Sequence, residues 1–341
     1  MTPRVLVHEE VREALEQDLP VVVLETAVLT HGLPRQPRPE APAVFGTPLA
    51  ESLEWEGTLP VNLATARALA ATVRDGGGVP ASSCVLDGVL RIGLEPEELE
   101  RLAMMEAEKC SARDLGRVMA SGGNGGTTVA GTLAACTAAN QSLDCSETGG
   151  LRVFATGGIG GVHRHWNRHA DVSADIQALS TSSLLVVTAG AKVILDLTAT
   201  REALDTNQIP VLGWQVGHFP RFTVQGRPGA LEVPQVDDIQ AVRSICHQHW
   251  DTLRRQEAIL LLNELPAALA LDGALVESIV EEALSAADDR RIEGPAMTPF
   301  LLEYMAEKTG GAALEANIAL LVNNVSLATR VAGALATDSA I

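Results

Sequence analysis

Hydrophobic residues along the chain follow two kinds of spacing. Spacing of three to four residues, typical of one face of a helix, occurs at 7–19, 64–78, 96–108, 238–253, 273–289, 299–311 and 315–336. Short continuous apolar runs, typical of buried strands, occur at 21–28, 80–94, 151–161, 182–190 and 210–214. Because strands and helices alternate, we expect an α/β fold with a central, mainly parallel sheet flanked by helices.

Two segments do not follow this pattern. Residues 35–57 are rich in proline and have no clear periodicity, and residues 140–150 are polar. Both are predicted to be surface loops or insertions. The length of 341 residues allows one large domain or two ordinary ones, and no internal repeat is present.

The amino-acid composition excludes some classes of protein. The chain has 25 basic and 43 acidic residues, a net charge of −18, and only 3% aromatic residues. This balance argues against binding of polymeric nucleic acid, which needs a basic face or stacking platforms. The five cysteines form no CxxC pair, the N-terminus has no signal-like apolar run, and no stretch of about 18 residues is free of polar breaks. We therefore expect a cytoplasmic protein without a membrane span.

Lysine is rare, and its positions raise the question of nucleophilic chemistry. Only Lys109, Lys192 and Lys308 occur, while the other 22 basic residues are arginine. Lys192 lies inside the apolar run 184–197. A lysine can become a neutral amine and act as a nucleophile, which arginine cannot. Chance, or a side chain that reaches out to water, is the alternative explanation. Lys109 and Lys308 also fit cations at helix C-termini, and Lys308 is assigned no chemistry.

A carboxylate and two glycine loops are further candidates. Glu25 interrupts the apolar run 21–28, where burial would raise its pKa and suit it to proton transfer. Alternatively, it ends the strand and faces solvent or an arginine. The glycine-rich stretches 121–132 and 155–164 can turn backbone amides toward an anion, or can simply form tight turns.

The stretch 160–175 combines imidazoles and carboxylates. It contains His163, His165, His169, Asp171 and Asp175. This donor set suits a divalent ion such as manganese or zinc, although the spacing matches no standard zinc motif. A polar loop without a metal is the alternative interpretation.

Taken together, these stretches resemble one family, the pseudouridine-5'-phosphate glycosidases, which includes the indigoidine synthase A proteins. The motifs that carry the resemblance, in order along the chain, are "VVVLETAVLTHGLP", "GGGVPASSCVLDG", "KCSARDL", "NGGTTVAGT", "FATGGIGGVHR", "DVSADIQAL", "VVTAGAKVILDL" and "LEANIALLVNN". They cover nearly the whole chain apart from the two loop segments. The resemblance therefore implies a single glycosidase domain over residues 1–341, with insertions at 35–57 and 140–150.

The resemblance also implies an activity. Members of this family reversibly cleave the carbon–carbon bond of pseudouridine 5'-phosphate to give uracil and ribose 5-phosphate. They use a divalent metal, usually manganese, and form homotrimers. A lysine amine forms a Schiff base with the opened sugar, which provides an electron sink for breaking a C–C bond. The pair of carboxylates that serves O-glycosidases would not suffice here.

Site residues are carried over by motif position. The resemblance implies Lys192 as the nucleophile and Glu25 as the proton donor, with Asp171 and, beside it, His163 as metal ligands. It implies substrate contacts at Lys109, Val129, Thr156, Ser173, Ala174, Asp175 and Asn317, of which Thr156 and Asn317 match positions near the phosphate.

The chain departs from the family pattern at two places. The segment 35–57 separates two motifs that usually follow closely; it is a lid, a solvent loop or retained noncoding sequence. Gly123 stands where the family tends to have a lysine, which puts one phosphate or substrate contact in doubt. Two other functions therefore stay open: a related reaction on another sugar phosphate or base, as in the indigoidine branch, and a catalytically silent binding or scaffold subunit.

Overall fold

A computed structural model describes residues 4–37, 58–143, 150–164, 166, 171–227, 229–292 and 297–336. The strands are β1 (Val5–Val7), β2 (Val21–Leu24), β3 (Val79–Leu86), β4 (Val89–Ile92), β5 (Glu108–Cys110), β6 (Gly125–Thr127), β7 (Val153–Ala155), β8 (Leu185–Thr188), β9 (Val211–Trp214), β10 (Gln235–Val236) and β11 (Ile259–Asn263). The predicted loop at 35–57 lies mainly outside the described residues. The loop predicted at 140–150 begins too early, because helix α6 (Val129–Ser142) continues to Ser142, and residues 144–149 lie outside the described part.

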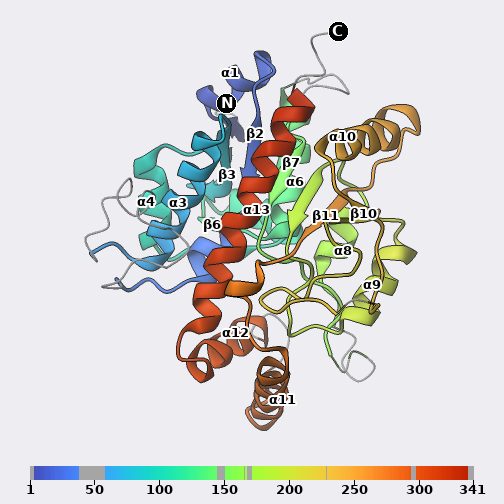
Figure 1. Cartoon of the computed structure of the whole chain (residues 1–341). Helices are drawn as coiled ribbons and strands as arrows, with labels where there is room; N and C mark the ends of the chain where they lie inside the picture. The colour runs from blue at the N-terminus through green and yellow to red at the C-terminus, as the bar shows by residue number, and fades with distance from the viewer. Residues whose placement is uncertain are drawn as a thin grey trace.

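Helices connect these strands (Figure 1). They are α1 (Glu9–Glu16), α3 (Val61–Asp75), α4 (Pro96–Met104), α5 (Ala112–Ala120), α6 (Val129–Ser142), α8 (Ala174–Leu179), α9 (Leu197–Thr206), α10 (Ile239–His247), α11 (Gly273–Asp289), α12 (Met297–Lys308) and α13 (Ala312–Ala336). Shorter helical turns are η1 (Val28–Gly32), η3 (Gln248–Thr252) and η4 (Ala267–Leu269).

The described strands form one sheet in the order β1-β4-β3-β2-β7-β8-β11-β9-β10, with β6 on β3 and β5 on β6. Neighbours from β3 through β2, β7, β8, β11 and β9 to β10 pair in parallel, whereas β4 and β6 run antiparallel to β3. The predicted α/β fold with a mainly parallel sheet is therefore confirmed. The order places β2, β7 and β8 side by side, so their carboxyl ends meet at one edge of the sheet.

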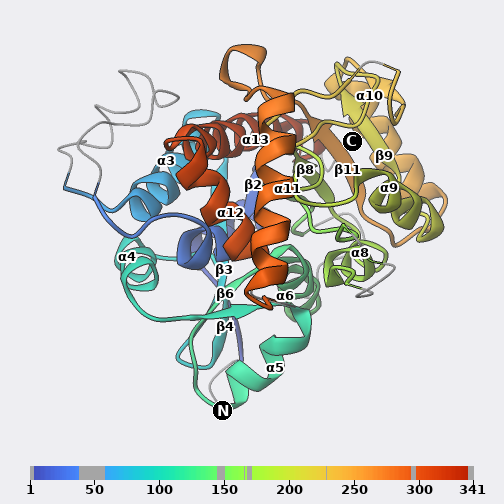
Figure 2. The same ribbon diagram turned by 90° about the horizontal axis from the view of Figure 1, so that it is seen from below.

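Helices cover both faces of the sheet, which explains why its strands are apolar without alternation. Viewed from below, α3 and α13 lie on one side of β2 and β8, and α6 and α8 lie on the other (Figure 2). All four residues of β2 and of β8 are buried. The core of the protein is thus the sheet and the apolar helix faces that pack on it.

Helix α13 is the central helix of this core. Among the described helices it alone is long and apolar enough to span a membrane by length and composition. Its residues Ile318, Leu320 and Val331 are fully buried in the protein, and it packs along β2, β7, β8 and β11. Packing against the sheet therefore accounts for its apolar character.

Most predicted elements agree with the structure. The helix predicted at 273–289 matches α11 residue for residue, and Asp87 and Gly88 form the expected turn between β3 and β4, both with positive φ. The helix predicted at 96–108 is too long, because α4 ends at Met104 and Lys109 lies in strand β5. The interpretation of Lys109 as a helix C-terminal cation is therefore wrong.

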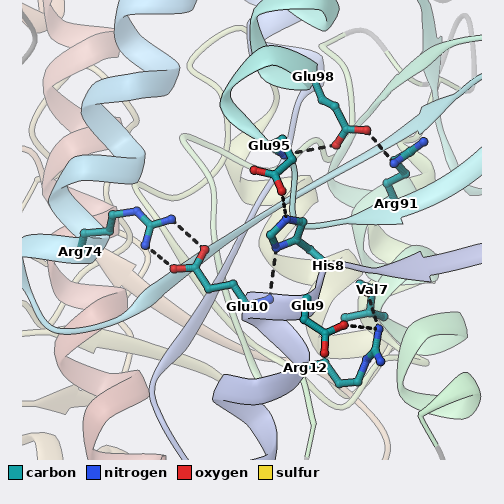
Figure 3. Close-up of polar contacts among 9 residues, drawn as sticks. All are labelled: Val7, His8, Glu9, Glu10, Arg12, Arg74, Arg91, Glu95 and Glu98. Atoms are coloured by element: carbon teal, nitrogen blue, oxygen red, sulfur yellow. Dashed lines mark hydrogen bonds and ion pairs between the residues drawn. The ribbon is translucent and has the colours of Figure 1, made fainter.

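Ionic contacts fasten the N-terminal helix to its neighbours (Figure 3). His8 caps α1 by accepting from the Glu10 amide and contacts Glu95, and both guanidinium nitrogens of Arg74 bind the Glu10 carboxylate. The side chains of Arg74 and Glu95 are exposed and that of Glu10 is 40% exposed, so each such pair contributes only about 0–1 kcal/mol to stability. These contacts therefore attach α1 to α3 and to the start of α4.

Candidate active site

Side chains with a carboxylate, a hydroxyl and an amine lie close to the ends of β2, β7 and β8. Glu25 is the first residue after β2, and Thr156 is the first residue after β7. Lys192 lies four positions after the last residue of β8. Because parallel neighbours end at the same edge, the fold brings these three residues together, as is usual for ligand sites in α/β sheets.

Glu25 lies in a partly buried position beside two groups that favour its charged form. The Thr156 hydroxyl donates a short hydrogen bond to the Glu25 carboxylate. The pKa of Glu25 is nevertheless raised, because burial outweighs the opposing effects of the Lys192 charge and of this hydrogen bond. Glu25 therefore stands just after the end of a strand, and among the described residues its hydrogen-bond partner is Thr156, with the charge of Lys192 nearby.

Backbone contacts fix the turn that carries Lys192. Gly190 adopts a φ of +88°, a conformation that favours glycine. The Lys192 amide donates to the Ile159 carbonyl at 3.2 Å, and the Lys192 carbonyl accepts from the Leu195 amide at 3.0 Å. The side chain is partly buried, and its charge affects the pKa values of Glu25, Lys109 and His163. Lys192 thus sits within electrostatic reach of Glu25, Lys109 and His163.

Lys109 contributes a second amine. Strand β5 pairs with β6, which sets Lys109 opposite Gly126. Although the residue as a whole is exposed, desolvation by the surrounding protein lowers its pKa, and the nearby Lys192 charge lowers it further. Glu25 and Asp175 act in the opposite direction. Two lysines and two carboxylates therefore share one charge cluster, which we call the lysine–carboxylate cluster: Glu25, Lys109, Asp175 and Lys192.

Asp175 ties the two glycine loops together. One carboxylate oxygen accepts from the Ala130 amide at 3.0 Å, and the other accepts from the Gly160 amide at 2.7 Å. Ser173 caps α8, with its hydroxyl accepting from the Asp175 amide at 3.2 Å. A Cβ on Gly160 would lie 2.3 Å from the Ser173 hydroxyl oxygen, so this position requires glycine. Asp175 therefore shapes the site through the backbone.

The other expected substrate contacts lie around the same loops. Val129 and Ala174 are the first residues of α6 and α8, the two helices that Asp175 joins. Asn317 of α13 lies beside the loop after Thr156, since a Cβ on Gly157 would be 3.7 Å from its side-chain oxygen. Gly123 lies in the turn after α5, where its carbonyl accepts from the Gly88 amide.

Two residues of the site's surroundings were not predicted from the sequence. Asn324 is fully buried in α13 and donates to the Thr156 carbonyl at 2.8 Å, which fixes the end of β7. His31, in η1, has its pKa lowered by burial and by the positive charges of Lys109 and Arg35. The only sequence signals are an asparagine in an apolar helix and a histidine six residues after Glu25.

His163 and Asp171 lie together, as the metal hypothesis requires. Their segments pair through Val162 and Val172, and His163 Nε2 is 3.8 Å from Asp171 Oδ2. Burial lowers the pKa of His163, which favours the neutral imidazole that binds metals. Within the part of the chain that the structure describes, no group of three potential ligands occurs, and His165 and His169 lie outside that part. The pair fits an ion that is also bound by water and substrate oxygens, as manganese and magnesium often are.

Fold and site together define an α/β protein with amine, carboxyl and imidazole groups at the carboxyl edge of its sheet. The family model for indigoidine synthase A like proteins matches residues 52–334, and the chain belongs to this family. Among its curated relatives are the pseudouridine-5'-phosphate glycosidases of Caldanaerobacter subterraneus subsp. tengcongensis, with 39% identity over 95% of this chain and 94% of the relative, and of Chloroflexus aurantiacus, with 40% identity over 96% and 97%.

Solved structures show the same fold. The prealnumycin C-glycosynthase AlnA, in complex with ribulose 5-phosphate, superposes with a TM-score of 0.80 and 31% identity over 98% of both chains. An indigoidine synthase A-like protein from Thermotoga maritima superposes with a TM-score of 0.79 and 29% identity over 98% of this chain and 97% of that chain. The resemblance deduced from the motifs is thereby confirmed.

Proposed function

We propose that this protein is a pseudouridine-5'-phosphate glycosidase, an enzyme that reversibly cleaves the C–C bond between uracil and ribose 5-phosphate. Full-length relatives carry this name at 36–40% identity, and a structural neighbour was solved with a sugar phosphate. The observation that carries the proposal is the proximity of the Lys192 charge to Glu25, whose pKa burial raises. A nucleophilic amine beside a carboxylic acid is the pair that this reaction needs.

Lys192 forms the covalent intermediate in this proposal. Its amine bonds to C1' of the sugar as the bond from C1' to the ring oxygen breaks, and the proton that the nitrogen then loses passes to the ring oxygen. The nitrogen lone pair then forms a C=N bond while the C1'–C5 bond breaks, and that electron pair moves to the uracil ring. Water adds to the imine and releases the Lys192 amine together with ribose 5-phosphate, so atoms and charges balance.

Glu25 supplies the proton that uracil C5 takes up on leaving. A raised pKa keeps a larger fraction of the carboxyl protonated near neutral pH, which a general acid requires. The Thr156 hydroxyl holds the Glu25 carboxylate, so we assign Thr156 a positioning role in addition to its expected place near the phosphate. The nearby Lys192 charge couples the protonation of the acid to the state of the nucleophile.

The substrate phosphate and hydroxyls bind along the two glycine loops in this proposal. Lys109 offers a positive charge to the phosphate dianion, and Val129, Ser173 and Ala174 lie at helix starts, where amides favour anions. Asn317 reaches the loop that follows Thr156. The Asp175 carboxylate is occupied by two backbone amides, so its proposed contribution is to hold both loops at the substrate.

A divalent ion, proposed to be manganese, would be held by Asp171 and His163. When bound, it supplies positive charge to oxygens of the sugar phosphate. The protein's own part is to present a carboxylate and a neutral imidazole on two paired segments next to Lys192. Homotrimeric assembly, implied by the family resemblance, and a cytoplasmic location, expected from the composition, complete the proposal; light scattering of the purified protein tests the former.

A second candidate is formation of a C–C bond between a pentose phosphate and an aromatic carbon other than that of uracil. The likeness to a C-glycosynthase over 98% of the chain favours it. The same lysine would serve, and only the pocket for the aromatic ring would differ. The two functions differ in the acceptor: either uracil or another aromatic ring forms the C–C bond with the sugar that is bound to Lys192.

The proposal is tested by incubating the protein with ribose 5-phosphate, uracil and manganese and measuring pseudouridine 5'-phosphate by mass spectrometry. The reverse reaction, with pseudouridine 5'-phosphate in water, should release uracil. Uridine 5'-monophosphate, which has a C–N bond, is the matched control and should stay intact. Failure of both directions with a folded sample would favour a silent family member, while a product with another aromatic acceptor would support the second candidate.

A further inference from the structure

Helix α11 lies in front of the sheet when the molecule is viewed from below (Figure 2). Its buried residues Val276, Val280 and Ala283 dock it into the main core. From the same helix, Glu277 extends to two arginines that belong to loops of the site. None of the chemistry proposed above uses Glu277, Arg164 or Arg221.

Arg164 links Glu277 to one side of the Lys192 turn. Its two terminal nitrogens bind both Glu277 carboxylate oxygens, at 2.5 and 3.1 Å, and one of them also binds Glu281 at 3.0 Å. The same guanidinium donates to the carbonyl of Val193, the residue after Lys192, at 3.2 Å. Only 16% of the Arg164 side chain is exposed, so this bidentate pair is stronger than an ordinary surface pair.

Arg221 links Glu277 to the other side of the turn. Its guanidinium binds Glu277 at 3.3 Å, and 17% of its side chain is exposed. The Arg221 backbone pairs with Gly190, two residues before Lys192, and the amide of Phe222 donates to the Ala189 carbonyl at 3.0 Å.

Phe222 carries a positive φ of 62°, which is costly for a bulky residue. Its ring lies against Gly158, where a Cβ would come within 2.7 Å. The segment around Arg221 is therefore held in a conformation that it does not prefer by itself. Contacts outside the segment, among them the pair with Glu277, must compensate for that strain.

We propose that Glu277 is a positioning residue for the Lys192 turn. One carboxylate anchors both segments that flank the turn, so it fixes where the amine stands relative to Glu25. Misplacement of a reacting group by about 1 Å can lower the rate about a hundredfold. The catalytic part of this inference rests on the proposed function, whereas the anchoring of the turn does not.

The test compares Glu277→Gln with Glu282→Gln in the full chain. Both changes remove one carboxylate from α11, but Glu282 pairs with Lys308 of α12 and not with the arginines. Hydrogen exchange of residues 189–196 is measured by mass spectrometry without substrate. We expect faster exchange of this segment in Glu277→Gln only, and no change in β2 or β7. Equal exchange of 189–196 in wild type and Glu277→Gln would overturn the proposal.

A second readout separates this inference from the proposed function. In wild type, borohydride should trap ribose 5-phosphate on Lys192, and Glu277→Gln should slow trapping between about tenfold and a hundredfold. Unchanged trapping in that variant contradicts the positioning role. If wild type traps no sugar at all, the proposed function fails, and hydrogen exchange still decides whether Glu277 anchors the turn. If Glu277→Gln does not fold, Arg221→Gln removes one anchor and is expected to accelerate exchange at 189–192.

Discussion

The Thr156 hydroxyl donates a hydrogen bond to the Glu25 carboxylate across the ends of the neighbouring strands β7 and β2. The bond stabilises the charged carboxylate, while burial favours the neutral acid and has the larger effect on the pKa. The Asn324 side chain in turn binds the Thr156 carbonyl. An acid with a raised pKa is thus held in place by a residue that limits how far the pKa rises.

Thr156→Val tests this relationship through the pH dependence of uracil release. Losing the hydroxyl removes a contact that lowers the Glu25 pKa, so the pKa of the variant lies higher. Because the acid form of Glu25 is the active form in the proposed mechanism, the rate should fall as pH rises through this pKa, and the falling limb should move to higher pH. We expect the maximal rate to drop about tenfold through lost orientation. Thr181→Val, at an exposed position, is the control. If the falling limb of the pH–rate profile does not move in Thr156→Val, a group other than Glu25 causes that limb.

Glu25→Gln should separate activity from stability. Turnover should fall by about 10²- to 10⁴-fold, because the glutamine amide cannot act as the acid that protonates uracil C5. The folded protein binds the Glu25 proton more tightly than the unfolded chain, so wild-type stability falls as pH rises from the ordinary glutamate pKa through the raised one. Glu25→Gln cannot lose stability in this way, so it should be more stable than wild type at pH values above the raised pKa of Glu25.

Urea unfolding at one pH below the window and one above it measures the difference. The exposed Glu13→Gln on α1 is the matched control, and its stability should follow wild type at both pH values. A Glu25→Gln variant that is less stable than wild type at the higher pH would mean that the Glu25 charge is compensated in the fold.

Gly160→Ala should destabilise the protein through the site. The added Cβ would lie 2.3 Å from the Ser173 hydroxyl oxygen and 2.8 Å from an Asp175 carboxylate oxygen. We expect a loss of about 1–3 kcal/mol in the free energy of unfolding, as for other forced close contacts. Gly116→Ala in α5 meets nothing within 4 Å and should instead gain about 0.5–1 kcal/mol. If the two changes have equal effects on the free energy of unfolding in urea, the loop that carries Gly160 can shift to accommodate the methyl group at little cost.

Removal of the metal tests the His163 and Asp171 assignment. Chelation should abolish turnover, and manganese should restore it. Asp171→Asn and His163→Ala should each weaken manganese binding by at least about tenfold, measured from the free-ion signal in electron paramagnetic resonance. Asp237→Asn, on the surface, serves as control. A rate that does not respond to chelation and add-back would show that the pair is only a polar contact.

Much of the fold could be predicted because its signals are local. Continuous apolar runs bounded by glycine and proline indicated β2, β7, β8 and β9, and helical spacing indicated α11 to the residue. The segments β5 and β6 could not be predicted, since three residues such as "GGT" carry no strand preference of their own. These strands form because β3 offers an edge to β6, which is a tertiary contact.

Candidate site residues could be named from the sequence, but their contacts with one another could not. Lys192 was marked by the scarcity of lysine, and Glu25 by its place in an apolar run. That Asp175 joins two loops 30 residues apart in sequence, at Ala130 and Gly160, depends on how the helices pack. The partners of Glu277 lie 56 and 113 residues away, a range over which no sequence pattern specifies pairing.

The role of Lys192 is tested most simply by identifying the amine that binds the sugar. The protein is incubated with ribose 5-phosphate, reduced with borohydride and digested, and the peptides are mapped by mass. We expect one adduct, on Lys192, with the mass of ribose 5-phosphate less one water plus two hydrogens. Lys192→Arg should abolish it, and Lys308→Arg, the matched change at the exposed lysine of α12, should keep it. An adduct on Lys109, or equal labelling of all three lysines, would show that Lys192 is not the nucleophile.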